Sequence, residues 1–316
     1  MEEHVALFSL SREESGWLRG AAILLVLLGH TGYIKWGGAG GVALFLILSG
    51  YGLCVSWLER GLKGFWGRRL RQVWLPYLLF GVFDCAVFRA DSVLSFLCTL
   101  LGLDFSRHPD PTMWYISFVL FWYLAFYVLA FLAERLARLP RAAVLLPGLL
   151  AAAYACKIAY YQGAWSVDSG AINYLLLFPL GAALAFLGRV PAGKGLRMDF
   201  WAAVLGLSLF WLIRVYGSWF DWAYALSMAA IPLAISQLRP LPMPKAIGRP
   251  LAWCGRCSYP MYLTEGLLLG VRNSWFGFLH AQALIDLCFL AATALSAWLV
   301  WELIQRILNK PVKNQS

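Results

Sequence analysis

The stretch WLRGAAILLVLLGHTGY, residues 17–33, places an apolar run between a cation, Arg19, and a titratable side chain, His30. A helix needs about 20 apolar residues to cross the hydrocarbon core of a bilayer. The run has no convincing small-residue cleavage site, and many similar segments follow it. We therefore interpret it as an uncleaved first transmembrane helix.

The composition of the whole chain agrees with a membrane location. Of the 316 residues, 61% are hydrophobic and 13% are charged, and the mean hydropathy is +0.68. A soluble domain has about 25% charged residues, because its surface must face water. The 16 Trp and 14 Tyr suit a membrane protein, since both collect at bilayer interfaces. We predict an all-α fold, a polytopic bundle of transmembrane helices.

Apolar runs of spanning length occur ten times, and we predict a transmembrane helix at each. These runs cover residues 17–34, 39–58, 73–89, 113–132, 142–160, 171–188, 199–216, 222–238, 257–272 and 281–304. The segment 92–103 is apolar but short, so we expect an interfacial or re-entrant segment there. No linker or separate soluble domain is visible, and we expect one transmembrane domain over residues 1–316.

The positive charges predict the orientation of these spans. With both termini in the cytoplasm, the inner loops and tails hold 20 of the 26 Lys and Arg residues. Cytoplasmic loops of membrane proteins carry such an excess. The same arrangement explains the net charge of +10 without nucleic acid as a partner.

Three titratable side chains within predicted spans stand out: His30 in the first span, Glu265 in the ninth and Glu302 in the tenth. Such groups cost about 2.5–3.5 kcal/mol at mid-bilayer on insertion scales, so each is a functional candidate. A neutral His30 could accept a proton near pH 7, or it could simply bond a backbone carbonyl. Arg19 precedes it by eleven residues, about 16 Å along a helix. Weaker candidates are Asp84 and Asp286.

The segment FWGRRLRQVWLPY, residues 65–77, places Arg68 and Arg71 three positions apart at the inner end of the third predicted span. On a helix these two side chains share a face. Paired guanidinium groups suit phosphate recognition through forked hydrogen bonds. The alternative is that both arginines only fix the topology and contact anionic lipid head groups.

Small residues and cysteines complete the survey. In GGVALFLILSGYGL, residues 40–53, the glycines and Ser49 allow helix backbones to approach closely, and packing alone would account for them. The seven cysteines include one CxxC pair, Cys254 and Cys257. No second pair or histidine follows at zinc-ligand spacing, so we expect no metal site.

Taken together and in this order, these segments resemble the acyltransferase-3 family of membrane acyltransferases. Arg19 and His30 are similar to its arginine, ten residues, histidine signature, and Arg68 with Arg71 to its RxxR pair. GGVALFLILSGY resembles its glycine-rich second span, and MWYISFVLFWYL, residues 113–124, its tryptophan-led fourth span. CSYPMYLTE, residues 257–265, resembles its Ser-Tyr and Tyr-Leu element. The resemblance extends over essentially the whole chain.

The resemblance implies transfer of an acyl group, often acetyl, from cytoplasmic acyl-CoA to a hydroxyl of an extracytoplasmic glycan or lipid-linked saccharide. It implies a bacterial cytoplasmic membrane and membrane lipids as surroundings. His30 would be the general base or would form an acyl-histidine. The donor would be held by Arg19, Arg68, Arg71, Ser49, Tyr51, Trp114 and Tyr115.

One position departs from the family pattern. The family commonly has a histidine just after the Tyr-Leu element, where this chain has Thr264 and Glu265. Either that histidine is dispensable, or Glu265 substitutes for it as a catalytic partner. A transporter or flippase of acyl or glycan intermediates is the alternative from another functional class, because it too would have many spans and buried titratable groups. The sequence identifies neither the acyl group nor the acceptor.

Overall fold

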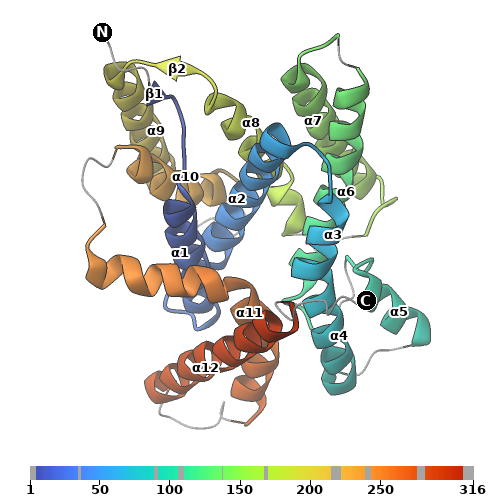
Figure 1. Cartoon of the computed structure of the whole chain (residues 1–316). Coiled ribbons are helices and arrows are strands. Elements are labelled where there is room, and N and C mark those ends of the chain that lie inside the picture. Colours follow the sequence, from blue (N-terminus) through green and yellow to red (C-terminus); the bar gives the residue numbers. More distant parts are fainter. Residues whose placement is uncertain are drawn as a thin grey trace, which may run out of the picture. The chain divides into compact units, whose positions relative to one another are not determined.

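The computed structural model describes residues 5–34, 37–88, 92–105, 110–136, 138–166, 170–214, 222–238, 243–275 and 282–308 (Figure 1). Nearly all of this chain is helical. Its contacts divide it into two compact units, Met1–Lys63 with Ser117–Arg256, and Gly64–Ile116 with Cys257–Ser316. Helices α6, Trp114–Arg135, and α11, Lys245–Trp275, contribute to both units.

The first unit is built mainly from helices of the amino-terminal and central parts of the chain. They are α1 (Arg12–His30), α2 (Gly37–Arg60), α7 (Arg141–Tyr161), a 3₁₀ turn at Ala171–Tyr174, α8 (Leu177–Leu187), α9 (Lys194–Arg214) and α10 (Trp222–Leu238). Two short strands, β1 (Val5–Ala6) and β2 (Pro191–Ala192), pair antiparallel with Val5 opposite Ala192.

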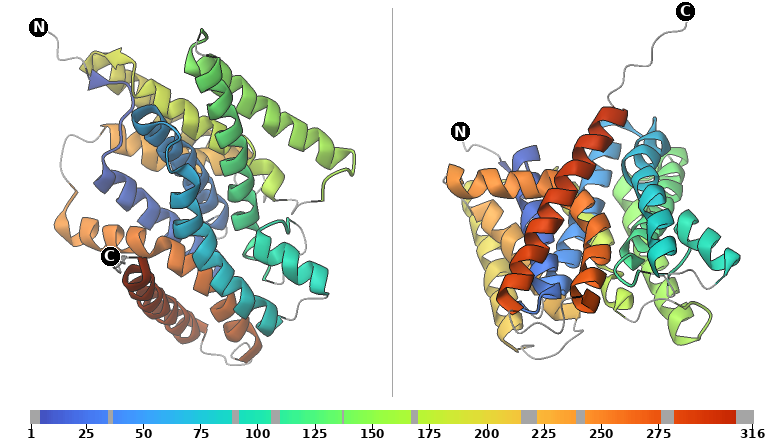
Figure 2. Two further views of the ribbon diagram at one scale, coloured as in Figure 1. Left: turned by 45° about the vertical axis from the view of Figure 1, so that its right-hand side comes forward. Right: turned by 90° about the horizontal axis from the view of Figure 1, so that it is seen from below.

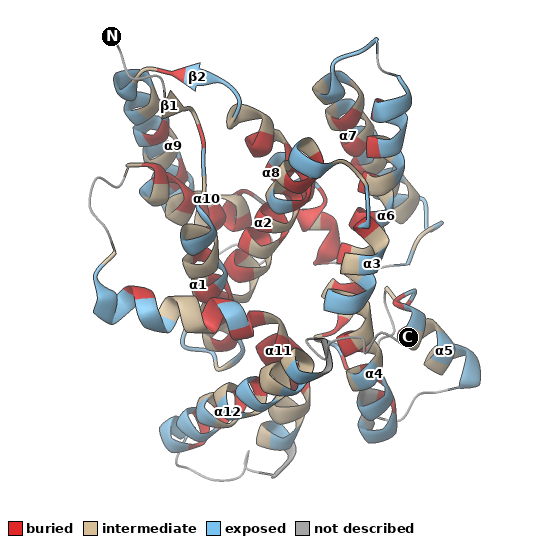
Figure 3. Cartoon of the chain, in the orientation of Figure 1, coloured by how far each residue is buried: buried red, intermediate tan, exposed pale blue. Residues whose placement is uncertain are grey.

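Helix α2 lies between α1 and α8, and its glycines allow backbones to touch (Figures 1 and 2). A Cβ on Gly41 would collide with the backbone carbonyl of Ala22 in α1. On the other side, a Cβ on Gly50 would collide with the carbonyl of Phe178 in α8. Side chains at these positions would force the helices apart, so the glycine-rich pattern has a packing role. Figure 3 shows mostly buried residues along α2 and α8.

The segment before the first helix is fixed in place by the rest of this unit. Phe8 is fully buried, with its ring 5.2 Å from the rings of both Tyr51 and Trp201. The Trp201 indole N–H donates to the carbonyl of Leu7 at 2.7 Å. Gln237 of α10 accepts from the N–H of Ser9 and donates to its carbonyl. This anchoring was not predicted, because the apolar stretch of residues 5–10 is too short to show a helical or strand periodicity.

The second unit contains helices from two separate stretches of chain. They are α3 (Phe65–Arg69), a π-helical turn at Leu70–Trp74, α4 (Leu75–Phe88), α5 (Val93–Leu101), α12 (Gln282–Leu308) and the parts of α6 and α11 named above. Helices α4 and α5 pack together, and the Tyr77 hydroxyl donates to the carbonyl of Thr99 at 2.5 Å. Thr99 in turn donates to the buried Asp104 carboxylate at 3.3 Å.

Each of the ten predicted spans coincides with helix over most of its length. Six segments among the described residues are long and apolar enough to cross a bilayer, and the helical stretches Ala171–Leu187 and Ala223–Leu238 are apolar but shorter. The six are Gly37–Arg60, Phe65–Val87, Trp114–Arg135, Arg141–Tyr161, Lys194–Arg214 and Gln282–Arg306. A helical membrane protein therefore fits the structure, while the count of ten spans and the orientation of the termini stay predictions. The segment 92–103 forms the nine-residue α5, with Val93 and Leu94 exposed.

Two glycines of α2, one in tight contact and one in open space, make a matched pair for testing this packing. Gly50→Ala places a methyl group against the Phe178 carbonyl, and we expect a loss of about 1–3 kcal/mol. Gly52→Ala meets nothing within 4 Å, so its higher helix propensity should leave stability unchanged or slightly raised. Thermal unfolding of both purified variants in the same detergent measures the difference; equal unfolding temperatures would contradict the packing role.

Candidate functional site

Helix α1 presents His30 as its last residue. The helix begins at a capping box, in which Glu14 accepts from the Ser11 N–H at 2.8 Å and its own N–H donates to the Ser11 hydroxyl at 3.1 Å. It ends where Thr31 caps it and Gly32 adopts a φ of 84°, a left-handed conformation that favours glycine.

Arg19 and His30 are both exposed, and they lie on the same face of α1, since eleven residues make almost three turns. Between them on that face, Ile23 and Val26 are buried against the rest of the protein. The Arg19 guanidinium bonds the carbonyl and hydroxyl of Ser15, both at 3.2 Å. The two polar groups are thus separated by a packed apolar segment rather than joined by an open groove along this face.

Glycines hold α1 closely against its neighbours near both polar groups. A Cβ on Gly20 would collide with the carbonyl of Leu251 in α11, and one on Gly255 with the carbonyl of Gly16. Next to His30, a Cβ on Gly29 would collide with the N–H of Gly38 in α2. These contacts leave little freedom to the backbone that carries Arg19 and His30, which suits residues that must be positioned for chemistry.

Two residues of α2 expected at the donor site have other observed surroundings. The Tyr51 hydroxyl accepts from the N–H of Leu10 at 3.2 Å, and its ring packs edge-on against Phe8. Ser49 is half-buried, directly before the close contact of Gly50 with α8. Both residues therefore have packing roles in the first unit, and donor binding by them stays a prediction.

The arginine pair belongs to the second unit and lies where the helix geometry changes. Arg68 is half-buried at the end of α3, whereas Arg71 is exposed within the π-helical turn. Pro76 explains the turn, because its ring clashes with the carbonyl of residue 72, four positions earlier, in a regular helix. Such turns are frequent at functional sites. The π-helical turn thus begins between the two arginines, and their shared face stays a prediction.

Two tyrosines of α11 tie the sequence motifs of the second unit together. The Tyr259 hydroxyl donates to the carbonyl of Val73, inside the π-helical turn, at 2.6 Å. The Tyr262 hydroxyl donates to the carbonyl of Thr112, just before α6. The Ser-Tyr and Tyr-Leu element is thus bonded both to the arginine turn and to the start of the tryptophan-led helix. Sequence reasoning recognised this element but assigned it no role.

The start of α6 brings further polar and aromatic groups to this part of the second unit. The buried Asp110 carboxylate accepts from the N–H and the hydroxyl of Thr112, both at 2.8 Å. Trp114 and Tyr115 contact each other edge-on, and the Tyr115 ring lies 5.6 Å from the ring of Tyr262. The predicted residues Trp114 and Tyr115 are therefore joined to α11 through Tyr262.

Glu265 is fully buried in α11, and its catalytic role stays a prediction. Its neighbour Gly266 lies directly against the Asp110 carboxylate, which occupies the space a Cβ would need. Asp110 was not predicted as a site residue. The signal for it was the Asp-Pro-Thr sequence before the helix, in which an Asp side chain bonds the backbone two residues on.

The remaining titratable candidates differ in their surroundings. The buried Asp286 of α12 forms an ion pair with Arg272 of α11, with N–O distances of 2.5 and 2.7 Å, and accepts from Gln282. This pair joins two helices. Glu302 is half-buried. The side chain of Asp84 and the histidines His4, His108 and His280 lie outside the described residues.

These observations describe a helical membrane protein with a titratable histidine at the end of a rigidly packed helix. Comparison with protein families places the chain in a defined group: the acyltransferase-3 family, described as an acyltransferase domain, matches residues 13–302. The chain belongs to this family. No match was found among curated proteins or among solved structures. The family resemblance seen in the sequence is confirmed, and it supports a membrane acyltransferase.

The bond from Tyr259 to the π-helical turn can be tested directly. Tyr259→Phe removes the donor to Val73, and we expect faster backbone hydrogen exchange in residues 70–76. The global cost should be about 0.5–1.5 kcal/mol, typical of one hydrogen bond. Tyr154→Phe, on an exposed tyrosine of α7, is the control. Unchanged hydrogen exchange in residues 70–76 would show that the Tyr259 hydrogen bond does not stabilise the π-helical turn.

Proposed function

We propose that this protein transfers an acyl group, often acetyl in this family, from acyl-CoA to a hydroxyl of an extracytoplasmic glycan or lipid-linked saccharide. The supporting observation is the exposed His30 at the end of the glycine-packed α1, in a chain that belongs to the acyltransferase-3 family. We place the protein in a bacterial cytoplasmic membrane, with acyl-CoA on the inner side and the acceptor on the outer side.

His30 acts as the general base in this proposal. Its neutral imidazole removes the proton of the acceptor hydroxyl, and the oxygen attacks the thioester carbonyl carbon. The carbon–sulfur bond then breaks, and the imidazolium returns a proton to the departing CoA thiolate. In the covalent variant, the imidazole attacks the thioester carbonyl carbon, the carbon–sulfur bond breaks, and the CoA thiolate leaves with the imidazole N–H proton. The acceptor hydroxyl then attacks the acyl-histidine, the carbon–nitrogen bond breaks, and the released imidazole takes up the hydroxyl proton. The exposed position of His30 leaves room for an acceptor in either route.

The donor phosphates bind to the cluster of cations around Arg68 and Arg71. Arg71 is exposed and the π-helical turn carries it, so its guanidinium is available to a ligand. Arg19 assists at the other end of α1 from His30. Because Ile23 and Val26 fill the face between Arg19 and His30, the pantetheine arm passes beside α1 rather than along this face.

Glu265 has a supporting role in this scheme. Glu265 is buried in α11 next to Gly266, and Gly266 contacts the carboxylate of Asp110, which precedes α6, so two acidic side chains lie in the same part of the second unit. In the family a histidine commonly follows the Tyr-Leu element. Here the Glu265 carboxyl group would instead orient a catalytic partner or stabilise a positive charge on it. Trp114 and Tyr115, held by the same segment, would offer aromatic surface to the donor or the sugar.

The histidine assignment predicts a specific loss of chemistry. We expect His30→Gln to lower acyl transfer by about 10²–10⁴-fold, the usual contribution of a general base. The readout is mass spectrometry of surface glycans from cells that carry each variant, with protein amounts in the membrane matched. His4→Gln is the control. Retention of full acylation by His30→Gln would exclude the catalytic role, and unchanged substrate transport without acylation would favour a transporter.

The donor site predicts a loss of binding rather than of folding. We expect the double variant Arg68→Ala, Arg71→Ala to weaken binding of CoA to the purified protein by about tenfold or more, because charge-assisted bonds to phosphate are lost. The control is Arg138→Ala with Arg12→Ala, two exposed cations elsewhere. Calorimetry with CoA measures both. If the double variant and the control bind CoA with equal affinity, Arg68 and Arg71 only fix the topology.

A further inference from the structure

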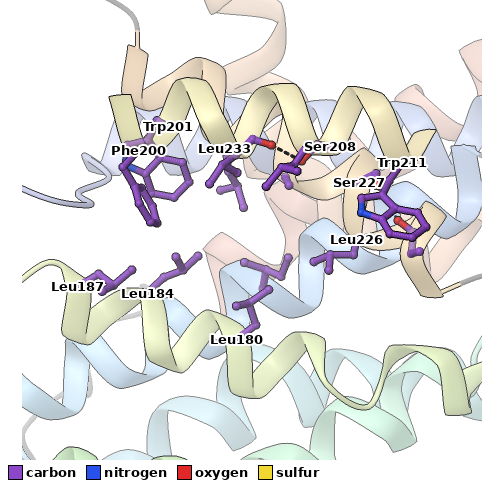
Figure 4. Close-up of a pocket in the computed structure, with 15 residues that line it drawn as sticks. Leu180, Leu184, Leu187, Phe200, Trp201, Ser208, Trp211, Leu226, Ser227 and Leu233 are labelled. Carbon is purple, nitrogen blue, oxygen red and sulfur yellow. Dashed lines mark hydrogen bonds between the residues drawn. The ribbon is translucent and has the colours of Figure 1, made fainter. Parts of the chain in front are cut away.

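An apolar groove runs along α9 in the first unit, between α8 on one side and α10 on the other (Figure 4). Its volume is about 470 Å³. In Figure 4, Leu180, Leu184 and Leu187 of α8 point toward the side of the groove formed by α9 and α10. A second cavity of about 350 Å³ shares Leu180 and Leu226 with it, so the apolar space continues toward α7. Neither cavity has a role in the proposed acyl transfer.

Three of the four polar side chains that line the groove form hydrogen bonds within the protein, and the fourth is Trp211. The hydroxyl of Ser208 donates to the carbonyl of Val204, and that of Ser227 to the carbonyl of Ala223, both at 2.7 Å. The indole N–H of Trp201 donates to the Leu7 carbonyl. A sugar or a nucleotide would lose its water here without gaining hydrogen bonds, which is costly. The chemistry of the groove therefore fits a hydrocarbon chain.

The groove opens at the surface of the protein, and its length matches one leaflet of a bilayer. Leu207 is 61% exposed and Trp211 is 49% exposed, although both line the groove. From Phe200 to Trp211 the helix rises about 16 Å, at about 1.5 Å per residue. This is close to half of the roughly 30 Å hydrocarbon core. A lipid chain in the surrounding bilayer can thus enter sideways and lie along α9.

Two cations mark one end of the groove. Arg189 follows α8 two residues after Leu187, and Lys194 begins α9 less than two turns before Phe200; both are exposed. Two of the cations here also donate within the protein: Arg189 to the carbonyl of Leu58 at 3.4 Å, and a third cation, Arg197, to the Gln237 side chain at 2.7 Å. Basic pockets beside membrane helices attract the phosphates of lipid head groups. An anionic head group would be next to Arg189 and Lys194 when its chain fills the groove.

We propose that this groove is a binding site for an anionic phospholipid, with one hydrocarbon chain along α9 and the phosphate at Arg189 and Lys194. The lipid supplies both features that the site matches, an apolar chain and a negative group at one end of it. The bound lipid holds α8 and α9 together in the bilayer. This inference is independent of the acyl-transfer proposal, because none of its residues belongs to the candidate site.

Native mass spectrometry of the detergent-purified full chain tests the site. The protein is incubated with equal amounts of phosphatidylglycerol and phosphatidylcholine that carry the same chains. We expect one lipid to be retained, with phosphatidylglycerol preferred about tenfold, as two neighbouring cations would give. Ala230→Phe, which puts a ring into the groove, should lower retention of both lipids about tenfold. Leu180→Trp is the second filling variant if Ala230→Phe fails to fold.

Matched variants separate the two parts of the site. Arg189→Gln with Lys194→Gln should remove the preference for phosphatidylglycerol while one lipid is still retained. The controls are Ala203→Phe, on the exposed side of α9, and Arg138→Gln with Lys157→Gln, two exposed cations elsewhere; all should bind like the natural protein. Equal retention of the two lipids by the natural protein, or full retention by both filling variants, would overturn the proposal. The proposal would also be overturned if the natural protein is a dimer without lipid and the filling variants are monomers, because a second copy would then occupy the groove.

Discussion

Backbone-to-backbone contact at the glycines of α2 is the constraint on which the first unit depends. Gly41 lies against the carbonyl of Ala22, Gly50 against that of Phe178, and Gly181 of α8 against that of Ile47. In lipid, helices gain little from burying apolar side chains against one another, so close van der Waals approach must supply much of the association. The same contacts fix α1, and through α1 they fix the direction of Arg19 and His30.

In the second unit, directional hydrogen bonds from tyrosines hold the motifs together. Tyr259 bonds the π-helical turn and Tyr262 bonds the segment before α6, so one helix, α11, controls the positions of the arginine pair and of Trp114. A hydroxyl bond of this kind is strong in an apolar surrounding, where water does not compete. Motifs that are far apart in the sequence therefore behave as parts of one local structure within this unit.

The helices were predictable from sequence because each apolar run is long enough to be read without knowledge of its neighbours. The details of the candidate site were not. The π-helical turn depends on how Pro76 excludes one carbonyl, and the role of Asp110 depends on its contact with Gly266, 156 positions later in the chain. The family motifs indicated which residues matter. Only the three-dimensional contacts show that Tyr51 is bonded to Leu10 and that Asp286 is paired with Arg272.

In the proposed acyl transfer, the buried face between Arg19 and His30 would limit how a donor reaches the histidine. Since Ile23 and Val26 are packed there, opening a path along this face would cost the close van der Waals contacts of two branched side chains. A path beside α1 avoids this cost and leaves the glycine contacts intact. The eleven-residue spacing then has a simple physical meaning: three helical turns carry a cation and an imidazole to opposite ends of one rigid, apolar segment, with both on the same side.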